Sequence, residues 1–482
     1  MKRIEFWALV LVVLVAIFFR FYHFESTPPG LYPDEAMNGN NALEAIKTGP
    51  LAGGFKVFYP ENNGREGLMM NLQALSLMVT GLSEPWALRL PSPIFGVLTV
   101  LGFFFLLLEL GGSAKLKSPL ILAFSGSFFL AVSYWHITFS RLGFRAIMAP
   151  LFLIFALYFF LVSLRKNSFR YSLAAGLMLG LGAYTYIAFR IMPFLFLVFV
   201  PYFWRRRGFW HLAFGLYLSA LIVAIPLLYY FGTHPADFLG RTTQVSIFHS
   251  PTPARDLAKN IVLTLGMFNV RGDGNWRHNY SGRPELFWPV GLLFLLGIGI
   301  AVKRRNIFGW TMTLMFLLAL LPVVISNEGL PHALRSILLI PPAFGFAASG
   351  ALWLCEYIKL RLTARHLAIV SVLILLGISA YTFKSYFLDW ASRPEVADAY
   401  AADYVALGRQ LDSLPDNVDK YIVVQARGVE VRGIPMPAQT VMFITDTFLP
   451  VDQARRHFHY LLPNQYEALK PSLNTGLIFF IR

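Results

Sequence analysis

The sequence predicts an α-helical membrane protein: a polytopic bundle of about 11 transmembrane helices with a small C-terminal extracytoplasmic α/β domain. Composition, recurring apolar runs and the placement of basic residues predict this class. Of the 482 residues, 56% are hydrophobic and 14% are charged, and the mean hydropathy is +0.57. Ordinary soluble domains carry about 25% charged residues. The composition therefore excludes a soluble, disordered, fibrous or coiled-coil protein.

Apolar runs long enough to cross about 30 Å of hydrocarbon recur along the chain. They lie at about 4–22, 86–108, 118–137, 147–164, 171–188, 191–204, 212–231, 286–302, 307–325, 336–355 and 366–386. Lys2 and Arg3 precede the first run, which lacks a small-x-small cleavage site. We therefore expect an uncleaved signal anchor.

Basic residues mark the loops on one side of the predicted bundle. They are Lys2, Arg3, Lys115, Lys117, Arg165, Lys166, Arg170, Arg205, Arg206, Arg207, Lys303, Arg304, Arg305, Lys359, Arg361 and Arg365. Loops rich in Lys and Arg face the cytoplasm. We therefore expect a multi-pass protein of the plasma (cell inner) membrane with a cytoplasmic N-terminus.

Three outer segments are large: about 23–85, about 232–285 and the tail from 387 to 482. We expect a transmembrane domain at 1–386 and an extracytoplasmic α/β domain at 387–482. Within the tail, the pattern predicts helices at 394–413 and 451–462 and strands at 420–425, 440–445 and 476–481.

The predicted membrane helices carry almost no ionisable residues at mid-depth, where transporters and proton pumps usually place them. Charges gather instead at the outer helix ends, which predicts a site at the outer membrane interface. Up to residue 335, the outward lysines are Lys47, Lys56 and Lys259. The outward arginines are Arg20, Arg65, Arg89, Arg141, Arg145, Arg190, Arg241, Arg255, Arg271, Arg277, Arg283 and Arg335. Arginine binds phosphate bidentately, so these residues fit a lipid phosphate. Arginines snorkelling to ordinary phospholipid fit equally well.

The first outer segment holds the candidate base. Asp34 and Glu35 follow Pro33 and lead into a helical pattern. A carboxylate at the membrane surface could remove a proton from an acceptor hydroxyl or amine. The alternative is structural: Asp34 caps the helix and Glu35 favours the positive end of its dipole.

The same segment continues with Arg65 and Glu66. Leu68, Leu72, Leu75, Val79 and Leu82 then recur at helical spacing. This pattern predicts an amphipathic helix in the membrane interface. Arg89 lies just inside the second apolar run, where a charge needs a carboxylate or phosphate partner.

Polar residues also cluster in three later outer loops. Tyr134, His136, Arg141 and Arg145 follow the third run, and His332 and Arg335 lie in a late loop. The long loop ends with Asp273, Asn275, Trp276, His278 and Asn279. Amides, carboxylates and aromatic faces suit a carbohydrate or acceptor site, whereas a solvated turn-rich loop is the alternative.

Several chemistries lack their signature. The single cysteine, Cys355, excludes an intramolecular disulfide and a thiolate metal cluster. The ten histidines show no HExxH spacing, so no dedicated zinc site is predicted, although Glu, Asp and His from different loops could form a weak divalent site. No Gly-rich strand–turn–helix motif is present, which argues against a nucleotide-sugar donor on a Rossmann domain.

The motifs together resemble the GT-C class of membrane glycosyltransferases. The branch they resemble holds the dolichyl-phosphate-mannose–protein mannosyltransferases and the lipid A aminoarabinose transferase. The matching motifs are PDEA (33–36), GREGL (64–68), ALRLPS (87–92), FSRLGFRAIMAPL (139–151), YTYIAFR (184–190), GDGNWRHN (272–279) and PHALR (331–335). They cover the chain to about residue 340. Gly67 stands where some relatives have a proline.

The resemblance implies a cell-envelope enzyme that takes a sugar from a polyprenyl-phosphate carrier on the outer face and inverts the anomeric carbon. It implies a hexosyl- or pentosyltransferase acting on a lipid, glycan or protein acceptor, including protein glycosylation, with membrane lipids and no nucleic acid as partners. Asp34 and Glu35 would be catalytic. Arg65, Arg89, Arg141 and Arg335 would bind the donor phosphate.

The resemblance assigns further residues to donor or acceptor binding. They are Glu66, Tyr134, His136, Tyr184, Tyr186, Arg190, Asp273, Asn275, His278, Asn279 and His332. No cofactor is required by the sequence, although a divalent cation such as Mg²⁺ or Mn²⁺ is compatible with it.

Three alternatives remain at this point. A transporter or flippase for lipid-linked sugars would need polar residues along a path through the membrane. An O-antigen polymerase or ligase would have its largest outer loop late in the chain. A structural membrane subunit would not need polar motifs clustered on one face.

Overall fold

A computed structural model describes residues 2–244, 246–327, 329–359, 363–470 and 476–482. The chain divides into two compact units. The helical unit comprises Met1–Tyr22, Ser92–Ser140 and Arg145–Trp390. The outer-segment unit comprises His23–Pro91, Arg141–Phe144 and Ala391–Arg482. Arg361, one of the predicted cytoplasmic charges, lies outside the described residues.

Each predicted apolar run contains a helix. These helices are α1 (Arg3–Phe21), α5 (Pro91–Ser113), α6 (Pro119–Ala131), α8 (Met148–Lys166), α9 (Phe169–Gly182), η3 (Ile187–Phe199), α10 (Val200–Phe203), α11 (Phe209–Thr233), α14 (Trp288–Arg304), α15 (Ile307–Val324), α16 (Ile340–Ile358) and α17 (Ala364–Phe383). The run predicted at 191–204 is 3₁₀-helical over most of its length and contains Pro193. Proline removes a backbone donor from the α-helical pattern.

By length and composition, seven helical stretches among the described residues could cross a membrane. They are Arg3–Phe21, Pro85–Ser113, Arg145–Lys166, Phe209–Thr233, Ile307–Val324, Ile337–Ile358 and Arg365–Trp390. The protein is therefore a multi-pass membrane protein, while the count of eleven crossings stays a prediction.

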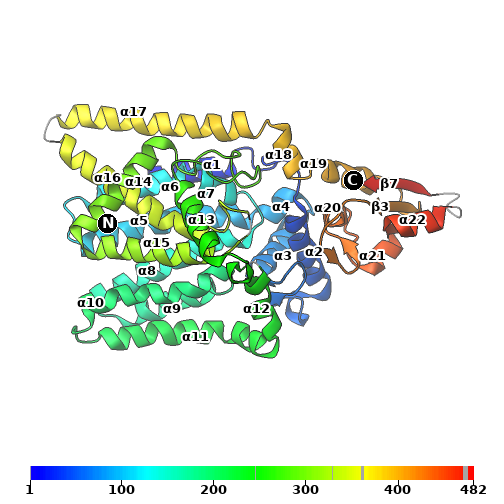
Figure 1. Ribbon diagram of the computed structural model, residues 1–482, viewed down its shortest axis with the longest axis horizontal. Helices are drawn as coiled ribbons and strands as arrows, with labels where there is room; N and C mark the ends of the chain where they lie inside the picture. Colours follow the sequence, from blue (N-terminus) through cyan, green and yellow to red (C-terminus); the bar gives the residue numbers. More distant parts are fainter. Residues whose placement is uncertain (1, 245, 328, 360–362, 471–475) are drawn as a thin grey trace. The chain divides into compact units, whose positions relative to one another are not determined.

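Glycines let neighbouring helices of the helical unit approach closely. Helices α9 and α11 run side by side (Figure 1). A Cβ at Gly176 would lie 2.2 Å from the Leu216 carbonyl oxygen, and a Cβ at Gly297 would lie 1.8 Å from that of Phe346. Small residues at such contacts are typical of helix packing in membranes.

Short elements complete the helical unit at the ends of the long helices. They are α7 (Tyr134–Phe139), η2 (Arg145–Ile147), α12 (Pro235–Gln244), η4 (Ile247–His249), α13 (Pro253–Gly266), η5 (Ile337–Leu339) and η6 (Lys384–Trp390).

The first half of the outer-segment unit is the predicted first outer segment. It forms α2 (Pro33–Thr48), η1 (Pro50–Ala52), β1 (Phe58–Tyr59), β2 (Arg65–Glu66), α3 (Leu68–Thr80) and α4 (Pro85–Arg89). Helix α3 confirms a helix over most of the predicted stripe, although it ends at Thr80, before Leu82; its place in the membrane interface stays a prediction. Leu75 and Val79 of the predicted stripe are exposed, whereas Gln73 and Ala74 are buried. Apolar side chains turned away from the protein fit a helix in the interface.

The tail is a small α/β region that shares a core with the first outer segment, because Met37 packs with tail residues such as Val441 and Met442. Its elements are α18 (Pro394–Ala399), α19 (Ala402–Asp412), β3 (Lys420–Val424), β4 (Glu430–Val431), β5 (Ile434–Pro435), α20 (Ala438–Ile444), α21 (Pro450–Arg455), β6 (Phe458–Leu461), α22 (Pro463–Leu469) and β7 (Leu477–Ile481). Strands β6, β3 and β7 form a parallel sheet in that order, with Lys420 opposite Phe458 and Leu477.

The local predictions for the tail are partly confirmed. The strands predicted at 420–425 and 476–481 are β3 and β7. The strand predicted at 440–445 is wrong, because helix α20 occupies it; a short apolar run does not distinguish a strand from a buried helix. The helix predicted at 394–413 breaks at Ala401, whose φ is +50°. The helix predicted at 451–462 ends at Arg455, and strand β6 follows it.

Candidate functional site

The predicted site residues form two groups, one in each unit. The outer-segment unit holds Asp34, Glu35, Arg65, Glu66, Arg89 and Arg141. The helical unit holds Tyr134, His136, Tyr184, Tyr186, Arg190, Asp273, Asn275, His278, Asn279, His332 and Arg335.

Glu35 and Arg89 form a buried ion pair. Arg89 Nε donates to Glu35 Oε2 at 2.8 Å and a terminal nitrogen of Arg89 donates to Oε1 at 3.0 Å. The side chains are 0% and 2% exposed. Arg89 also donates to the Pro28 carbonyl, and the Gly143 N–H donates to Glu35. The carboxylate is one of the two partners predicted for Arg89. The Glu35 carboxylate faces protein donors, and all three guanidinium nitrogens of Arg89 face protein acceptors.

Asp34 has a more open environment than its neighbour. It lies in the first turn of α2, is partly exposed, and accepts a hydrogen bond from Asn62 Nδ2 at 3.0 Å. The helix begins at Pro33 with Tyr32 at the N-cap and no side-chain cap bond. The alternative in which Asp34 caps the helix is therefore wrong, and the carboxylate remains accessible beside a helix N-terminus.

Arg65 and Arg141 hold protein groups of the outer-segment unit. Arg65 is 4% exposed and donates to the side-chain oxygens of Asn38 and Asn41 in α2. Arg141 is fully buried and donates twice to the Thr27 carbonyl, at 3.1 and 2.8 Å. Glu66 is buried in strand β2. These contacts place both arginines in the scaffold around α2.

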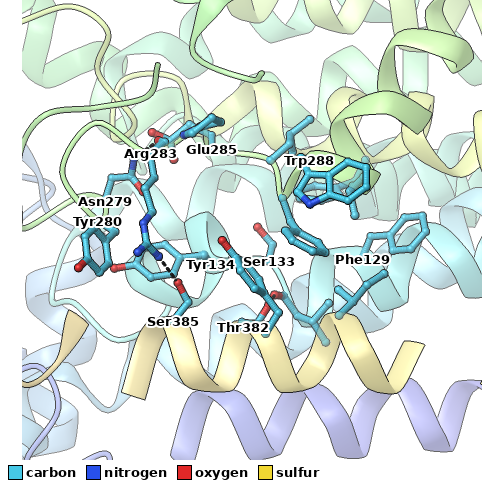
Figure 2. A pocket seen from close by; sticks show the side chains of 18 residues that line it. Phe129, Ser133, Tyr134, Asn279, Tyr280, Arg283, Glu285, Trp288, Thr382 and Ser385 are labelled. Carbon is cyan, nitrogen blue, oxygen red and sulfur yellow. Dashed lines mark hydrogen bonds between the residues drawn. The ribbon is translucent and has the colours of Figure 1, made fainter. Parts of the chain in front are cut away.

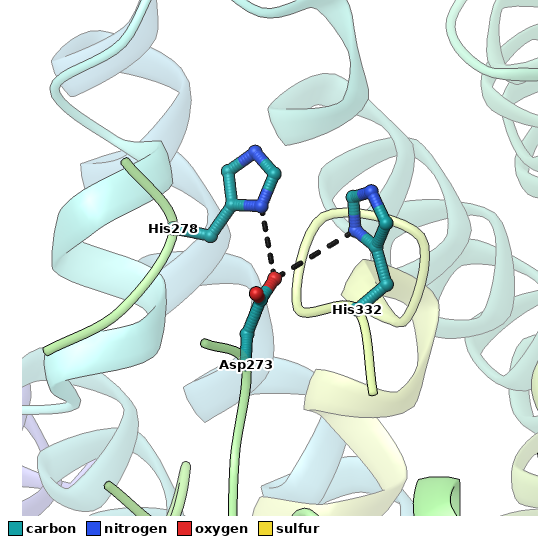
Figure 3. Close-up of side chains that lie close together, drawn as sticks. All are labelled: Asp273, His278 and His332. Atoms are coloured by element: carbon teal, nitrogen blue, oxygen red, sulfur yellow. Dashed lines mark hydrogen bonds and ion pairs between the residues drawn. The ribbon is translucent and has the colours of Figure 1, made fainter. Parts of the chain in front are cut away.

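In the helical unit, Asp273, His278 and His332 converge (Figure 3). His278 Nδ1 lies 2.9 Å from Asp273 Oδ2, and His332 Nδ1 lies 3.8 Å from the same oxygen. The Ala333 N–H also donates to that oxygen at 2.9 Å. One ligand atom from each of the three residues can be chosen so that all lie within 4.8 Å of one another. The loops that carry the GDGNWRHN and PHALR motifs are therefore in contact.

The electrostatics favour an ionised aspartate beside neutral imidazoles. Burial lowers the pKa of His278, against the opposing effect of Asp273. Burial and the nearby His278 hold the pKa of His332 well below its ordinary value. Burial tends to raise the pKa of Asp273, but the hydrogen bond and charge of His278 outweigh it, and the pKa is lowered. Deprotonated ligands of this kind are the form that binds divalent metals.

The residues around this cluster shape its loops. Asp273 Oδ1 accepts from the Asn275 N–H, and Asn279 donates to the Asp273 and Arg283 carbonyls. Arg335 donates to the Ser326 hydroxyl. Asn275 and Asn279 thus support the turn that carries Asp273.

The other predicted binding residues contact structural groups. His136 Nδ1 pairs with a terminal nitrogen of Arg20 at 2.7 Å, Tyr184 donates to the Val223 carbonyl and Arg190 to the Phe238 carbonyl. The Arg145 guanidinium lies 5.9 Å from the Tyr186 ring centroid. Tyr134 packs edge-on against Tyr386 and Trp390.

A cavity of about 370 Å³ lies beside the Asp273 loop (Figure 2). One end is polar and contains Arg283, Ser385 and Glu285, while Phe129 and Trp288 line the other. An Arg283 terminal nitrogen donates to the Ser385 hydroxyl at 2.7 Å, and its guanidinium carbon lies 3.5 Å from the Tyr280 ring centroid. The sequence indicated Arg283 only as one of twelve outward arginines.

Glu285 connects the cavity to the Asp–His–His cluster. Its Oε1 accepts from the Asp273 N–H at 3.0 Å, and its Oε2 is buried without a hydrogen-bond partner among the described residues. Burial raises the pKa of Glu285 well above its ordinary value. Sequence reasoning missed this residue, because nothing in the local pattern marks it as buried.

No protein-family model matches this chain, and no curated protein matches it. Solved structures do. Archaeal oligosaccharyltransferase AglB from Archaeoglobus fulgidus, in complex with an inhibitory peptide and a dolichol-phosphate, is similar over 96% of this chain and 65% of its own, with TM-score 0.54 and 15% identity. ArnT from Cupriavidus metallidurans, bound to undecaprenyl phosphate, is similar over 96% of this chain and 95% of its own, with TM-score 0.55 and 16% identity.

The chain has the GT-C fold. This confirms the predicted fold class and the predicted resemblance at the level of the fold. The chain spans about two thirds of the length of AglB and nearly the full length of ArnT.

Proposed function

We propose that the protein is an integral-membrane glycosyltransferase that moves a sugar from a polyprenyl-phosphate carrier to an acceptor at the outer membrane face. The GT-C fold supports this proposal, since similar structures carry dolichol-phosphate and undecaprenyl phosphate. The observation that carries it is the cavity of the helical unit, which combines an apolar wall with an arginine at its polar end.

The cavity suits a lipid phosphate better than Arg65, Arg89 and Arg141, three of the four arginines predicted from sequence to bind it. Arg65, Arg89 and Arg141 donate to oxygens of the protein itself. Arg283 is half-buried, and Ser385 is the hydrogen-bond acceptor that the structure gives it. An arginine in this position can add a charge-assisted bond to a phosphate oxygen, while the aromatic wall receives the adjoining isoprenoid carbons.

In the outer-segment unit, Asp34 acts as the general base. It removes a proton from the acceptor hydroxyl or amine, and the nucleophile forms a bond to the anomeric carbon with inversion. The bond from that carbon to the phosphate oxygen breaks, and polyprenyl phosphate leaves with the electron pair. Glu35 and Arg89 hold the start of α2 in place beside the base. The acceptor is a lipid, a glycan or a protein.

Asp273, His278 and His332 fit a divalent cation. A carboxylate with two neutral imidazoles suits Mn²⁺ or Zn²⁺ better than Mg²⁺, which prefers oxygen ligands. A bound cation would supply positive charge to a departing phosphate. The chain's own contribution is to hold His278 against Asp273 and to fix Asp273 with the Ala333 N–H.

The basic loops support an orientation with the N-terminus in the cytoplasm and the outer-segment unit outside. In this orientation the outer-segment unit, which carries Asp34, is extracytoplasmic. The variant Glu25→Cys, at an exposed position, would check this orientation in intact cells. A thiol reagent that does not cross the membrane should label it.

Purified protein in lipid nanodiscs tests the function directly. We expect release of polyprenyl phosphate from at least one member of a panel of polyprenyl-phosphate sugars, with a lipid extract, glycan or peptide as acceptor. Asp34→Asn should bind the carrier and release none above background. Failure of every donor to bind or react would overturn the proposal, and headgroup movement between leaflets without transfer would indicate a flippase.

A further inference from the structure

Helix α2, which carries Asp34, packs against α20 of the tail. Ala36 and Ala42 of α2 share a buried cluster with Phe443 of α20. Met37 lies in a second cluster with Val441 and Met442 of α20. The tail thus contributes to the packing of two faces of α2.

The contact is close enough to require a glycine in α2. A Cβ at Gly39 would lie 2.5 Å from Cδ2 of Phe443 and 3.0 Å from Cδ2 of Leu88. Real Cβ atoms essentially never approach another heavy atom within 3.0 Å. The Phe443 ring therefore fixes the distance between α2 and α20.

Two buried polar contacts fix the register of the same helices. The Thr440 hydroxyl donates to the Leu31 carbonyl at 2.9 Å, and both residues are fully buried. Asn40 Nδ2 donates to the Gln439 carbonyl at 3.1 Å and to its Oε1 at 2.9 Å. Leu31 stands three residues before Asp34, so the first contact holds the backbone that leads into the candidate base.

We infer that Thr440 is a positioning residue, which acts through the Leu31 carbonyl to aim Asp34, with Phe443 setting the depth of α2. The inference rests on the proposed function of Asp34. Without the hydroxyl, the Leu31 carbonyl is buried without that partner, and the segment 31–33 must shift to find another. A displacement of about 1 Å at a reacting group can cost on the order of 10²-fold in rate.

Thr440→Val removes the hydroxyl at nearly constant volume, and Thr440→Ser keeps it. In full-length protein in nanodiscs, we expect Thr440→Val to lower kcat about tenfold with the donor KM within twofold, because Asp34 does not bind the donor. Thr440→Ser should stay within about threefold of wild type. An unchanged kcat in Thr440→Val, or equal losses in both variants, would overturn the inference. So would a lowered Tm with normal kcat per folded molecule, because that result indicates folding support alone.

A size exchange tests the same inference if Thr440→Val does not accumulate. Gly39→Ala should lower kcat, and adding Phe443→Leu should restore at least half of the loss because it removes the ring atoms that meet the new methyl group. Failure to restore would contradict a role for Phe443. Asp34→Asn is assayed in parallel: if it stays active, both the base and this inference fail, whereas an inactive Asp34→Asn beside a fully active Thr440→Val overturns this inference alone.

Discussion

Glu35 and Arg141 of the outer-segment unit differ from Glu285 and Arg283 of the helical unit in how many hydrogen bonds the protein itself gives them. In the outer-segment unit, Glu35 receives two bonds from Arg89 and one from Gly143, and Arg141 donates twice to one carbonyl. In the helical unit, Glu285 keeps a buried oxygen without a partner among the described residues, and Arg283 has one hydroxyl acceptor. Side chains whose hydrogen bonds are all made within the protein stabilise the fold, whereas side chains that can accept or donate further hydrogen bonds can bind a ligand. Residue type alone does not reveal this difference.

Asp34 of the outer-segment unit is partly exposed, and it gives the largest expected effect. Asp34→Asn should lower kcat by about 10²–10⁴-fold, the usual contribution of a general base, while carrier binding is retained. Single-turnover sugar transfer measures the loss. Glu25→Gln, an exposed acid of the same segment, is the control and should retain full activity; equal activity of Asp34→Asn would remove Asp34 from the chemistry.

Breaking the Glu35–Arg89 ion pair should lower the free energy of unfolding. Glu35→Gln leaves Arg89 buried beside a neutral amide, and removing one partner of such a pair destabilises by about 3–5 kcal/mol. Denaturant unfolding in detergent measures it. The double variant Glu35→Gln, Arg89→Met should recover part of the loss, because no unpaired charge remains. A single-variant loss below about 1 kcal/mol would argue against the buried pair.

The Asp–His–His cluster should bind Mn²⁺ through His332. His332→Ala is expected to weaken Mn²⁺ binding at least about tenfold. The control is His249→Ala, which replaces an exposed histidine of the same unit and should leave the Mn²⁺ affinity unchanged. Electron paramagnetic resonance of free Mn²⁺ measures both. Equal affinities of the two variants would remove His332 from the ligand set.

The Mn²⁺ affinity of the Asp–His–His cluster should depend only weakly on pH. The pKa values of His278 and His332 are lowered by burial, so both imidazoles take up fewer protons at pH 6.5 than exposed histidines do. Mn²⁺ affinity should therefore change less than about twofold between pH 7.5 and 6.5. Two exposed imidazoles of pKa about 6.5 would lose about threefold over this range. A threefold loss would contradict the buried, neutral state.

The smallest expected effect is that of Glu285→Gln on thermal stability. Burial raises the pKa of Glu285 above that of the unfolded chain, so the stability that its neutral form gives is full below about pH 4.3 and is lost as the pH rises through the folded pKa. The amide does not ionise. The Tm of Glu285→Gln relative to wild type should therefore rise by about 2 °C or more between pH 5 and pH 7.5. A difference independent of pH would contradict the raised pKa.

The sequence predicted the helical elements well because apolar runs of membrane length have few alternatives. It failed at 440–445, where Val441, Met442 and Phe443 are apolar because they face α2 and its neighbours and not because they alternate in a strand. The sequence predicted that Arg89 needs a partner, because a buried charge is unfavourable without one. It could not identify Glu35 as that partner, because the fold brings residues 35 and 89 together. Arg283 could not be singled out among the outward arginines, because its distinction is the cavity around it.

Carrier binding by Arg283 tests the central claim most directly. Polyprenyl phosphate would be titrated into wild type, Arg283→Ala and Arg271→Ala, an exposed arginine of the same loop, in nanodiscs. The account predicts that Arg283→Ala raises Kd about 10–100-fold, as expected for a lost charge-assisted hydrogen bond, and that Arg271→Ala changes it less than about twofold. Equal Kd values for wild type and Arg283→Ala would contradict a lipid-phosphate site in this cavity.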